Sequence, residues 1–151
     1  VDGELVLGVS SAPALGRRWW ARRGGGAFAD GEPIRVSGVE RVSDAHVCAP
    51  SERYFDAAGL GDGYRSLARR CWRAAGFADF WGHVLVAEGA VDVMVEPVLG
   101  IWDIAALRPI VEEAGGRVSD LTGVGWADGA PCVTTNGLLH DEVLTMIGAP
   151  S

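Results

Sequence analysis

The most informative segment of the chain is Glu96-Pro-Val-Leu-Gly-Ile-Trp-Asp103-Ile-Ala-Ala-Leu-Arg-Pro-Ile-Val-Glu-Glu-Ala-Gly-Gly116. It places Asp103 at the entrance of a predicted helix and Glu96 one short loop earlier, at the end of a predicted strand. A helix entrance carries free N–H groups and the positive end of the helix dipole, so it attracts anions and the acidic side chains that organise phosphate chemistry. The stretch therefore predicts a strand, a loop and a helix that together present two carboxylates.

Two periodicities flank the loop. Valine occupies every second position from Val91 to Val95, which is typical of a half-buried strand. The apolar residues from Ile104 to Ala114 fit one face of a helix that ends at Gly115-Gly116. Pro109 falls inside that helix and predicts a kink, because an interior proline removes a hydrogen bond and clashes with the preceding turn.

Working outward, strands and helices alternate along the chain, and this places it in the mixed α/β class. The N-terminal part reads as a β-meander with turns at 24–26 and 30–31 and strands over 4–12, 17–21 and 34–36. Further strands are predicted over 45–49, 71–75, 117–121 and 132–135, and helices over 64–70, 79–87 and 140–147. A short helix follows Pro50, and Ser51 is in position to cap it.

Length, charge and cysteine spacing exclude several kinds of partner and site. The chain has 151 residues, 48% of them hydrophobic, which suits one domain or a large piece of one. A net charge of −7 argues against a nucleic-acid partner and is compatible with a site for metal cations. No apolar run is long enough to span a bilayer. The three widely spaced cysteines form no C-x-x-C pair, which argues against structural zinc and predicts reduced, mostly buried thiols in a cytoplasmic protein.

Each candidate site residue has a structural alternative. Asp103 is an N-cap or a metal ligand, and a carboxylate has enough lone pairs to be both. Glu96, held extended by the following proline, is an exposed strand-end charge or an acceptor for substrate hydroxyl or amine groups. Asp79 caps the helix that begins there, or its carboxylate meets a cationic substrate group. The basic and aromatic run over 17–23 is read as solvated arginines with tryptophans packed inward, in preference to a nucleic-acid surface.

The 96–116 stretch resembles the C-terminal signature of the inositol monophosphatase family of metal-dependent phosphatases. That signature has a Trp-Asp dipeptide, here Trp102-Asp103, leading a helix that closes in Glu-Ala-Gly-Gly, here Glu113 to Gly116. The segments 8–13, 24–28 and 30–37 resemble the family's central β-meander, and 85–92 resembles the helix and strand before the signature. The resemblance covers nearly the whole chain in the right order, and it implies a layered α-β-α-β fold.

Within the family, the residues most resemble the histidinol-phosphate phosphatase branch. The stretches that carry this are 11–21, Asp79-Phe-Trp81 and 136–141. Relatives that act on inositol phosphates usually have small residues where this chain has Ala78-Asp79-Phe80. An acidic residue at that position suits a substrate with an amine or an imidazole.

The resemblance also implies roles and a gap. Asp103 would hold Mg²⁺ and be the catalytic acidic residue, Glu96 would orient the alcohol part of a small phosphate monoester, Asp79 would read its cationic end and Arg73 would assist in placing it. The family takes its other metal ligands from an upstream Glu-Glu motif and an Asp-Pro-x-Asp-Gly-Thr motif, and neither occurs ahead of the meander here. The chain is therefore expected to be the C-terminal part of one such domain, over residues 1–151, with the N-terminal metal-binding part absent.

Three functions follow as hypotheses. The first is Mg²⁺-dependent hydrolysis of histidinol phosphate in histidine biosynthesis, by an enzyme that is a homodimer when complete and has no nucleic-acid or membrane partner. The second is a phosphatase for inositol or another small sugar phosphate. The third is a non-catalytic remnant that keeps half of the fold.

Overall fold

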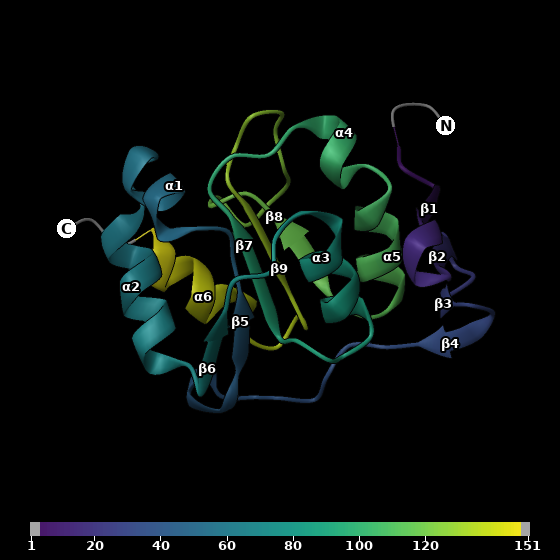
Figure 1. Cartoon of the computed structure of the whole chain (residues 1–151), viewed down its shortest axis with the longest axis horizontal. Helices are drawn as coiled ribbons and strands as arrows, with labels where there is room; N and C mark the ends of the chain where they lie inside the picture. Colours follow the sequence, from purple (N-terminus) through teal and green to yellow (C-terminus); the bar gives the residue numbers. More distant parts are fainter. Residues whose placement is uncertain (1–3, 149–151) are drawn as a thin grey trace.

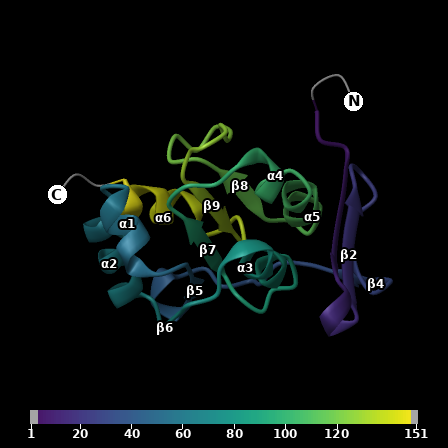
Figure 2. The same ribbon diagram turned by 45° about the horizontal axis from the view of Figure 1, so that its top comes forward.

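A computed structural model describes residues 4–148, and it stacks helices and sheets in alternating layers (Figure 1). One sheet has four strands in the order β1-β2-β3-β4, and the other has five in the order β6-β5-β7-β9-β8. Helices α3 (Asp79–Ala87) and α5 (Leu107–Glu113) lie between the two sheets, as the turned view in Figure 2 shows. The expected layered α/β fold is confirmed.

The four-stranded sheet is the predicted meander. Its strands are β1 (Leu7–Ala12), β2 (Arg17–Arg22), β3 (Ala27–Ala29) and β4 (Glu32–Ile34), each antiparallel to the next. The last strand begins two residues earlier than predicted, because pairing resumes directly after the turn, with Ala29 opposite Glu32. It also ends earlier, because the Val36 N–H leaves the sheet and donates to the Ala114 carbonyl at 3.0 Å.

The five-stranded sheet is mixed. Strands β5 (His46–Cys48), β6 (Arg73–Ala75) and β7 (Val93–Glu96) are parallel, with β5 in the middle. Strand β9 (Cys132–Thr135) runs antiparallel to β7 and to the edge strand β8 (Arg117–Ser119). The carboxyl ends of three strands therefore meet at one edge of this sheet, which is where open α/β sheets place their ligands.

Strand β7 corrects one prediction. The alternating pattern indicated a half-buried strand, but all four residues of β7 are buried. Val93 and Val95 pack into the cluster that contains Phe55 and Leu67, whereas Met94 packs on the other face. Both faces are covered because β7 is central, and a central strand has no solvent-exposed side for polar residues to occupy.

The outer helices cover the face of this sheet that turns away from the meander. They are α1 (Glu52–Ala57), α2 (Gly61–Arg70) and α6 (His140–Ile147). Ser51 is at the N-cap position of α1, but its side chain makes no capping hydrogen bond. A Cβ at Gly63 of α2 would lie 2.3 Å from the Ile147 carbonyl oxygen, so this glycine permits the close approach of α2 to α6.

The predicted helix with a kink at Pro109 is two helices. The first, α4 (Ile101–Ile104), has Ala105 at its C-cap position, and α5 begins at Leu107. Pro109 is the third residue of α5, in the first turn, where a backbone N–H has no intrahelical acceptor and its loss costs little. The proline therefore fits without a kink, because the chain restarts its helix just before it.

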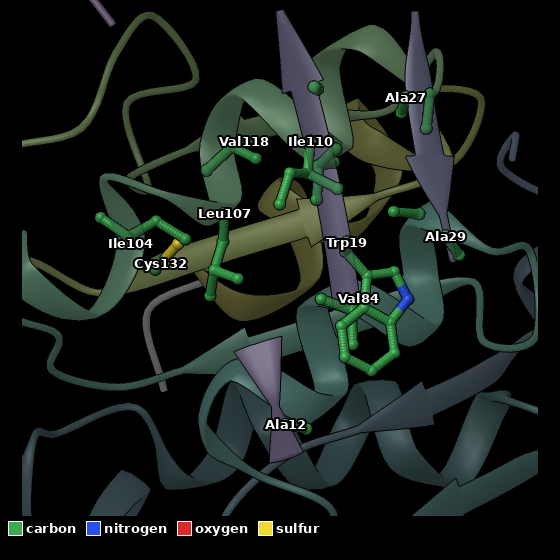
Figure 3. Packing of buried hydrophobic residues seen from close by; sticks show 14 of the residues in the cluster. Ala12, Trp19, Ala27, Ala29, Val84, Ile104, Leu107, Ile110, Val118 and Cys132 are labelled. Atoms are coloured by element: carbon green, nitrogen blue, oxygen red, sulfur yellow. The ribbon is translucent and has the colours of Figure 1, made fainter. Parts of the chain in front are cut away.

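A large apolar cluster fills most of the layer between the sheets (Figure 3). Trp19 is fully buried and lies edge-on to Trp81 at 5.8 Å between ring centroids, which confirms that this tryptophan packs inward. Its indole N–H donates to Glu88, and Arg17 forms ion pairs with Glu88 and Asp30, each at 2.6 Å. Arg17 and Trp19 of the basic and aromatic run therefore hold the meander against α3.

Two further expectations concern reactivity and membranes. All three cysteines are free, with Cys48 and Cys132 buried and Cys71 partly buried, as expected for reduced thiols. Within residues 4–148, none of the helices has the length and apolar character needed to cross a bilayer.

Candidate functional site

A cleft of about 590 Å³ opens at the edge where β5, β6 and β7 end. Each of the three strands contributes the residues that follow it, because parallel strands direct their carboxyl ends to the same side. The lining residues are Pro50, Ser51, Tyr54, Ala57 and Ala58 after β5, Gly76, Ala78 and Asp79 after β6, and Glu96, Pro97 and Val98 at the end of β7.

Glu96 is buried in this cleft, with only 6% of its surface exposed. It is therefore not the exposed strand-end charge that was the structural alternative. The pKa of its carboxyl is raised from 4.5 to about 7, mainly because the group is buried. The charges of Asp79 and Asp103 contribute to this rise, and a backbone hydrogen bond from Asp79 opposes it. Glu96 thus changes its charge near neutral pH, where an ordinary glutamate is fully ionised.

Asp79 is the first residue of α3 and is exposed at the cleft. The expected capping role is wrong, because Ala78 occupies the N-cap position and α3 has no side-chain cap. The backbone at Asp79 has φ of 57°, and its N–H donates to Glu96 Oε1 at 3.0 Å. Its carboxylate therefore remains available to a ligand.

Asp103 is the third residue of α4 and does not hold the N-cap position, which is Gly100. It still serves the helix entrance, because Asp103 Oδ2 accepts the Gly100 N–H at 3.2 Å. A second carboxylate, Asp128 from the loop before β9, accepts the Ile101 N–H at 2.8 Å. Asp103 is exposed, and its charge contributes to the raised pKa of Glu96.

The structure brings Asp79 and Asp103 each within electrostatic reach of Glu96, whereas Arg73 stands apart. Arg73 is the first residue of β6 and lies opposite His46 of β5 in the strand register. It is exposed and stands at the end of the strand away from the cleft. Strand β6 ends two residues later, at Ala75, about 7 Å along an extended chain. It is not among the residues that line the cleft.

These carboxylates do not by themselves make a magnesium site. Among residues 4–148, no three histidine, cysteine, aspartate or glutamate side chains are grouped closely enough to hold a metal ion. Mg²⁺ requires near-octahedral oxygen coordination, and Asp103 offers it one carboxylate. The described residues therefore do not fit a complete Mg²⁺ site.

Sequence reasoning missed the contribution of α1. Tyr54 lines the cleft, with the guanidinium of Arg53 4.8 Å from its ring centroid and Arg53 Nη2 donating to its hydroxyl at 2.9 Å. Ser51 lines the cleft as well. Their position directly after β5 was visible in the sequence, but that β5 lies parallel to β7 was not.

The fold is a layered α/β domain with an acidic cleft at one sheet edge, and comparison with known proteins identifies its family. The model of the inositol monophosphatase family matches residues 1–146, so the chain belongs to this family.

Two of the relatives are histidinol-phosphatases, and a third is an IMPase. The chain is 46% identical to a histidinol-phosphatase of Mycobacterium tuberculosis and 42% identical to one of Streptomyces coelicolor, with 98% and 93% of this chain aligned. It is also similar in structure to an IMPase of Thermotoga maritima, with a TM-score of 0.85 over 97% of this chain at 35% identity. The chain spans 59% and 55% of the length of the two histidinol-phosphatases and 57% of the Thermotoga structure.

Proposed function

We propose that this chain is the substrate-binding part of a phosphomonoesterase whose substrate is histidinol phosphate. The observation that carries the proposal is the acidic cleft: of the residues that line it, Asp79 and Glu96 are acidic and none is basic. Histidinol carries an amine and an imidazole, and a carboxylate attracts such cationic groups most strongly where water is partly excluded. The similarity to two histidinol-phosphatases supports the same substrate.

The two acidic residues take different parts in this proposal. Asp79, exposed and first in α3, receives the cationic end of the alcohol. Glu96, buried at the end of β7, orients a hydroxyl or amine group, and its raised pKa allows it to donate or accept a hydrogen bond near neutral pH. Arg73 lies at the far end of β6, so any role of it in placing the substrate is indirect.

Asp103 contributes one ligand toward Mg²⁺ in this proposal. Its Oδ2 accepts the Gly100 N–H, and no hydrogen bond to Oδ1 is found within residues 4–148. The remaining ligands would come from an N-terminal metal-binding part outside these residues. The complete enzyme would be a cytoplasmic homodimer of histidine biosynthesis, a setting compatible with three free cysteines.

Ligand binding tests the substrate class on this chain even if the metal site is incomplete. Isothermal titration calorimetry would compare histidinol with inositol, for the unaltered chain and for Asp79→Asn. We expect histidinol to bind more tightly than inositol. The substitution should weaken histidinol binding about 10-fold to 100-fold, because a hydrogen bond to a charged group is worth about 1.5–3 kcal/mol. The control is Asp44→Asn, which changes an exposed aspartate just before β5, at the opposite edge of the sheet. It should leave the affinities for histidinol and inositol unchanged.

Phosphate release from histidinol phosphate, with Mg²⁺ and then with a chelator, tests the activity. Chelator-sensitive release that Asp79→Asn lowers for histidinol phosphate but not for inositol monophosphate would support the proposal. Equal losses on both substrates would refute the recognition role of Asp79. A preference for inositol monophosphate would favour the sugar-phosphate alternative. Failure to bind histidinol or inositol, together with inactivity after an upstream segment is added, would favour a non-catalytic remnant.

A further inference from the structure

Asp79 has an unusual backbone for the first residue of a helix. Among residues 4–148, only Asp30 and Asp79 combine a side chain with a positive φ. Asp30 is explained by its turn, since it precedes Gly31 in the connection between β3 and β4 and its carboxylate accepts the Arg18 N–H at 2.7 Å. Asp79 begins a nine-residue helix, where residues normally adopt φ near −63°. Left-handed backbone at a non-glycine residue is uncommon, and it concentrates at functional sites.

The left-handed conformation has one visible consequence. The preceding residue, Ala78, is extended, and the reversal at Asp79 directs the Asp79 N–H out of the helix and onto Glu96 Oε1 at 3.0 Å. This bond joins α3 to β7 at the lining of the cleft, although the two residues are 17 apart in sequence. Glu96 Oε2 makes no hydrogen bond to any residue in the range 4–148, so one oxygen is anchored and the other is left for a ligand.

The groups around Glu96 explain why this anchor matters. Asp79 faces it from α3, Asp103 from α4, and Cys132 lies opposite it on β9. The two carboxylates and burial all oppose a negative charge on Glu96, and the Asp79 N–H is the one favourable contribution recorded for it among the described residues. Without that donor, the carboxyl would have neither a fixed orientation nor local support for its ionised form.

We infer that Asp79 is a positioning residue for Glu96 through its backbone, in addition to any contact that its side chain makes with a ligand. The left-handed conformation at Asp79 holds the N–H on Oε1 and so presents Oε2 to the cleft. The use of Glu96 by a substrate rests on the proposed function, but the positioning itself is a property of this chain.

A pair of substitutions isolates the backbone effect. Asp79→Gly and Asp79→Ala both remove the carboxylate, but glycine tolerates a positive φ and alanine does not. Carboxyl-carbon NMR of the 15.8 kDa chain follows the titration of Glu96 directly. We expect the Glu96 midpoint in Asp79→Ala to lie about 0.5 to 1 pH unit above that in Asp79→Gly, the equivalent of one hydrogen bond to the ionised form. Equal midpoints in the two variants would overturn the inference.

Two further measurements keep the test independent of folding and of activity. In the unaltered chain, the amide proton of residue 79 should shift with a midpoint equal to that of Glu96, and an amide that stays flat through this range would also overturn the inference. Asp30→Ala is the matched control, since it strains the other left-handed aspartate and should lower stability without moving the Glu96 midpoint. A chain that positions Glu96 in this way but binds no histidinol would refute the proposed substrate and leave the positioning intact.

Discussion

Glu96→Gln should stabilise the chain at high pH and leave its stability nearly unchanged in acid. Glutamine keeps the shape of the side chain and an oxygen that can accept the Asp79 N–H, but it carries no charge at any pH. The difference in stability between the two chains therefore measures how much the ionisation of the buried Glu96 carboxyl costs the folded state.

The magnitude follows from the two pKa values. The carboxyl ionises at 4.5 in the unfolded chain and at about 7 in the folded chain. Below pH 4.5 both states are protonated and the group contributes nothing. Between pH 4.5 and 7 the unfolded chain loses its proton first, so stability falls as pH rises, by about 1.4 kcal/mol per pH unit. Above pH 7 the loss levels off at about 3 kcal/mol.

Urea denaturation followed by tryptophan fluorescence, at pH values from 4.5 to 8.5, measures this difference. Other titrating groups are the same in both chains, so subtracting the two free energies of unfolding at each pH leaves the contribution of Glu96. We expect Glu96→Gln to be more stable than the unaltered chain by about 3 kcal/mol at pH 8.5, with the gap closing toward pH 4.5. A stability difference that does not change with pH would show that burial does not raise the pKa of Glu96. The role given to Glu96 in the cleft would then be refuted.

Three more predictions concern the fold and the metal. Burial lowers the pKa of both His83 and His140 to about 4, so the unfolded chain takes up their protons first as pH falls below 6.5. Unfolding of Glu96→Gln, which lacks the opposing contribution of Glu96, should show stability lost between pH 6.5 and 4, and a stability of this variant that rises on acidification would contradict the prediction. A Cβ at Gly8 would lie 2.0 Å from a backbone oxygen of the α4–α5 connection, so Gly8→Ala should lower the free energy of unfolding by about 1–3 kcal/mol, whereas Gly38→Ala, with open space around it, should not. Asp103→Asn, made in an enzyme that has the complete metal site, should keep its melting temperature and lose Mg²⁺-dependent phosphate release; full activity at unchanged Mg²⁺ would remove Asp103 from the metal site.

The local patterns in the sequence located most elements because they depend on neighbouring residues. The bounds of α3 and α6 agree with the predicted ranges, and the glycine-rich and Asp-Gly turns lie where the meander needs them. The misjudged elements depend on distant contacts. Strand β7 looked half-buried because alternation describes one strand alone, whereas its burial comes from helices on both faces of the sheet.

In the candidate site too, some features follow from local sequence patterns and others depend on distant contacts. Asp103 was placed at a helix entrance from the sequence, and the structure keeps it there, although Gly100 holds the N-cap position and Asp128 supplies a second acceptor. The predicted kink at Pro109 became a break between α4 and α5, because helix bounds respond to packing as well as to propensity. Arg73 is close to Asp79 in the sequence, but the fold places it at the end of β6 that lies away from the cleft.

The mixed α/β class, the order of the elements, the family resemblance and the acidic character of the candidate site were all predictable from the residues alone. These features depend on composition and on spacings of a few residues, which a chain carries whether it is folded or not. Three other features arise from packing: β5, β6 and β7 end at one edge, Glu96 is buried there, and the backbone of Asp79 turns its N–H toward Glu96. Burial, a raised pKa and a hydrogen bond between residues 17 apart are properties of a packed interior, so they exist only once the layers have assembled.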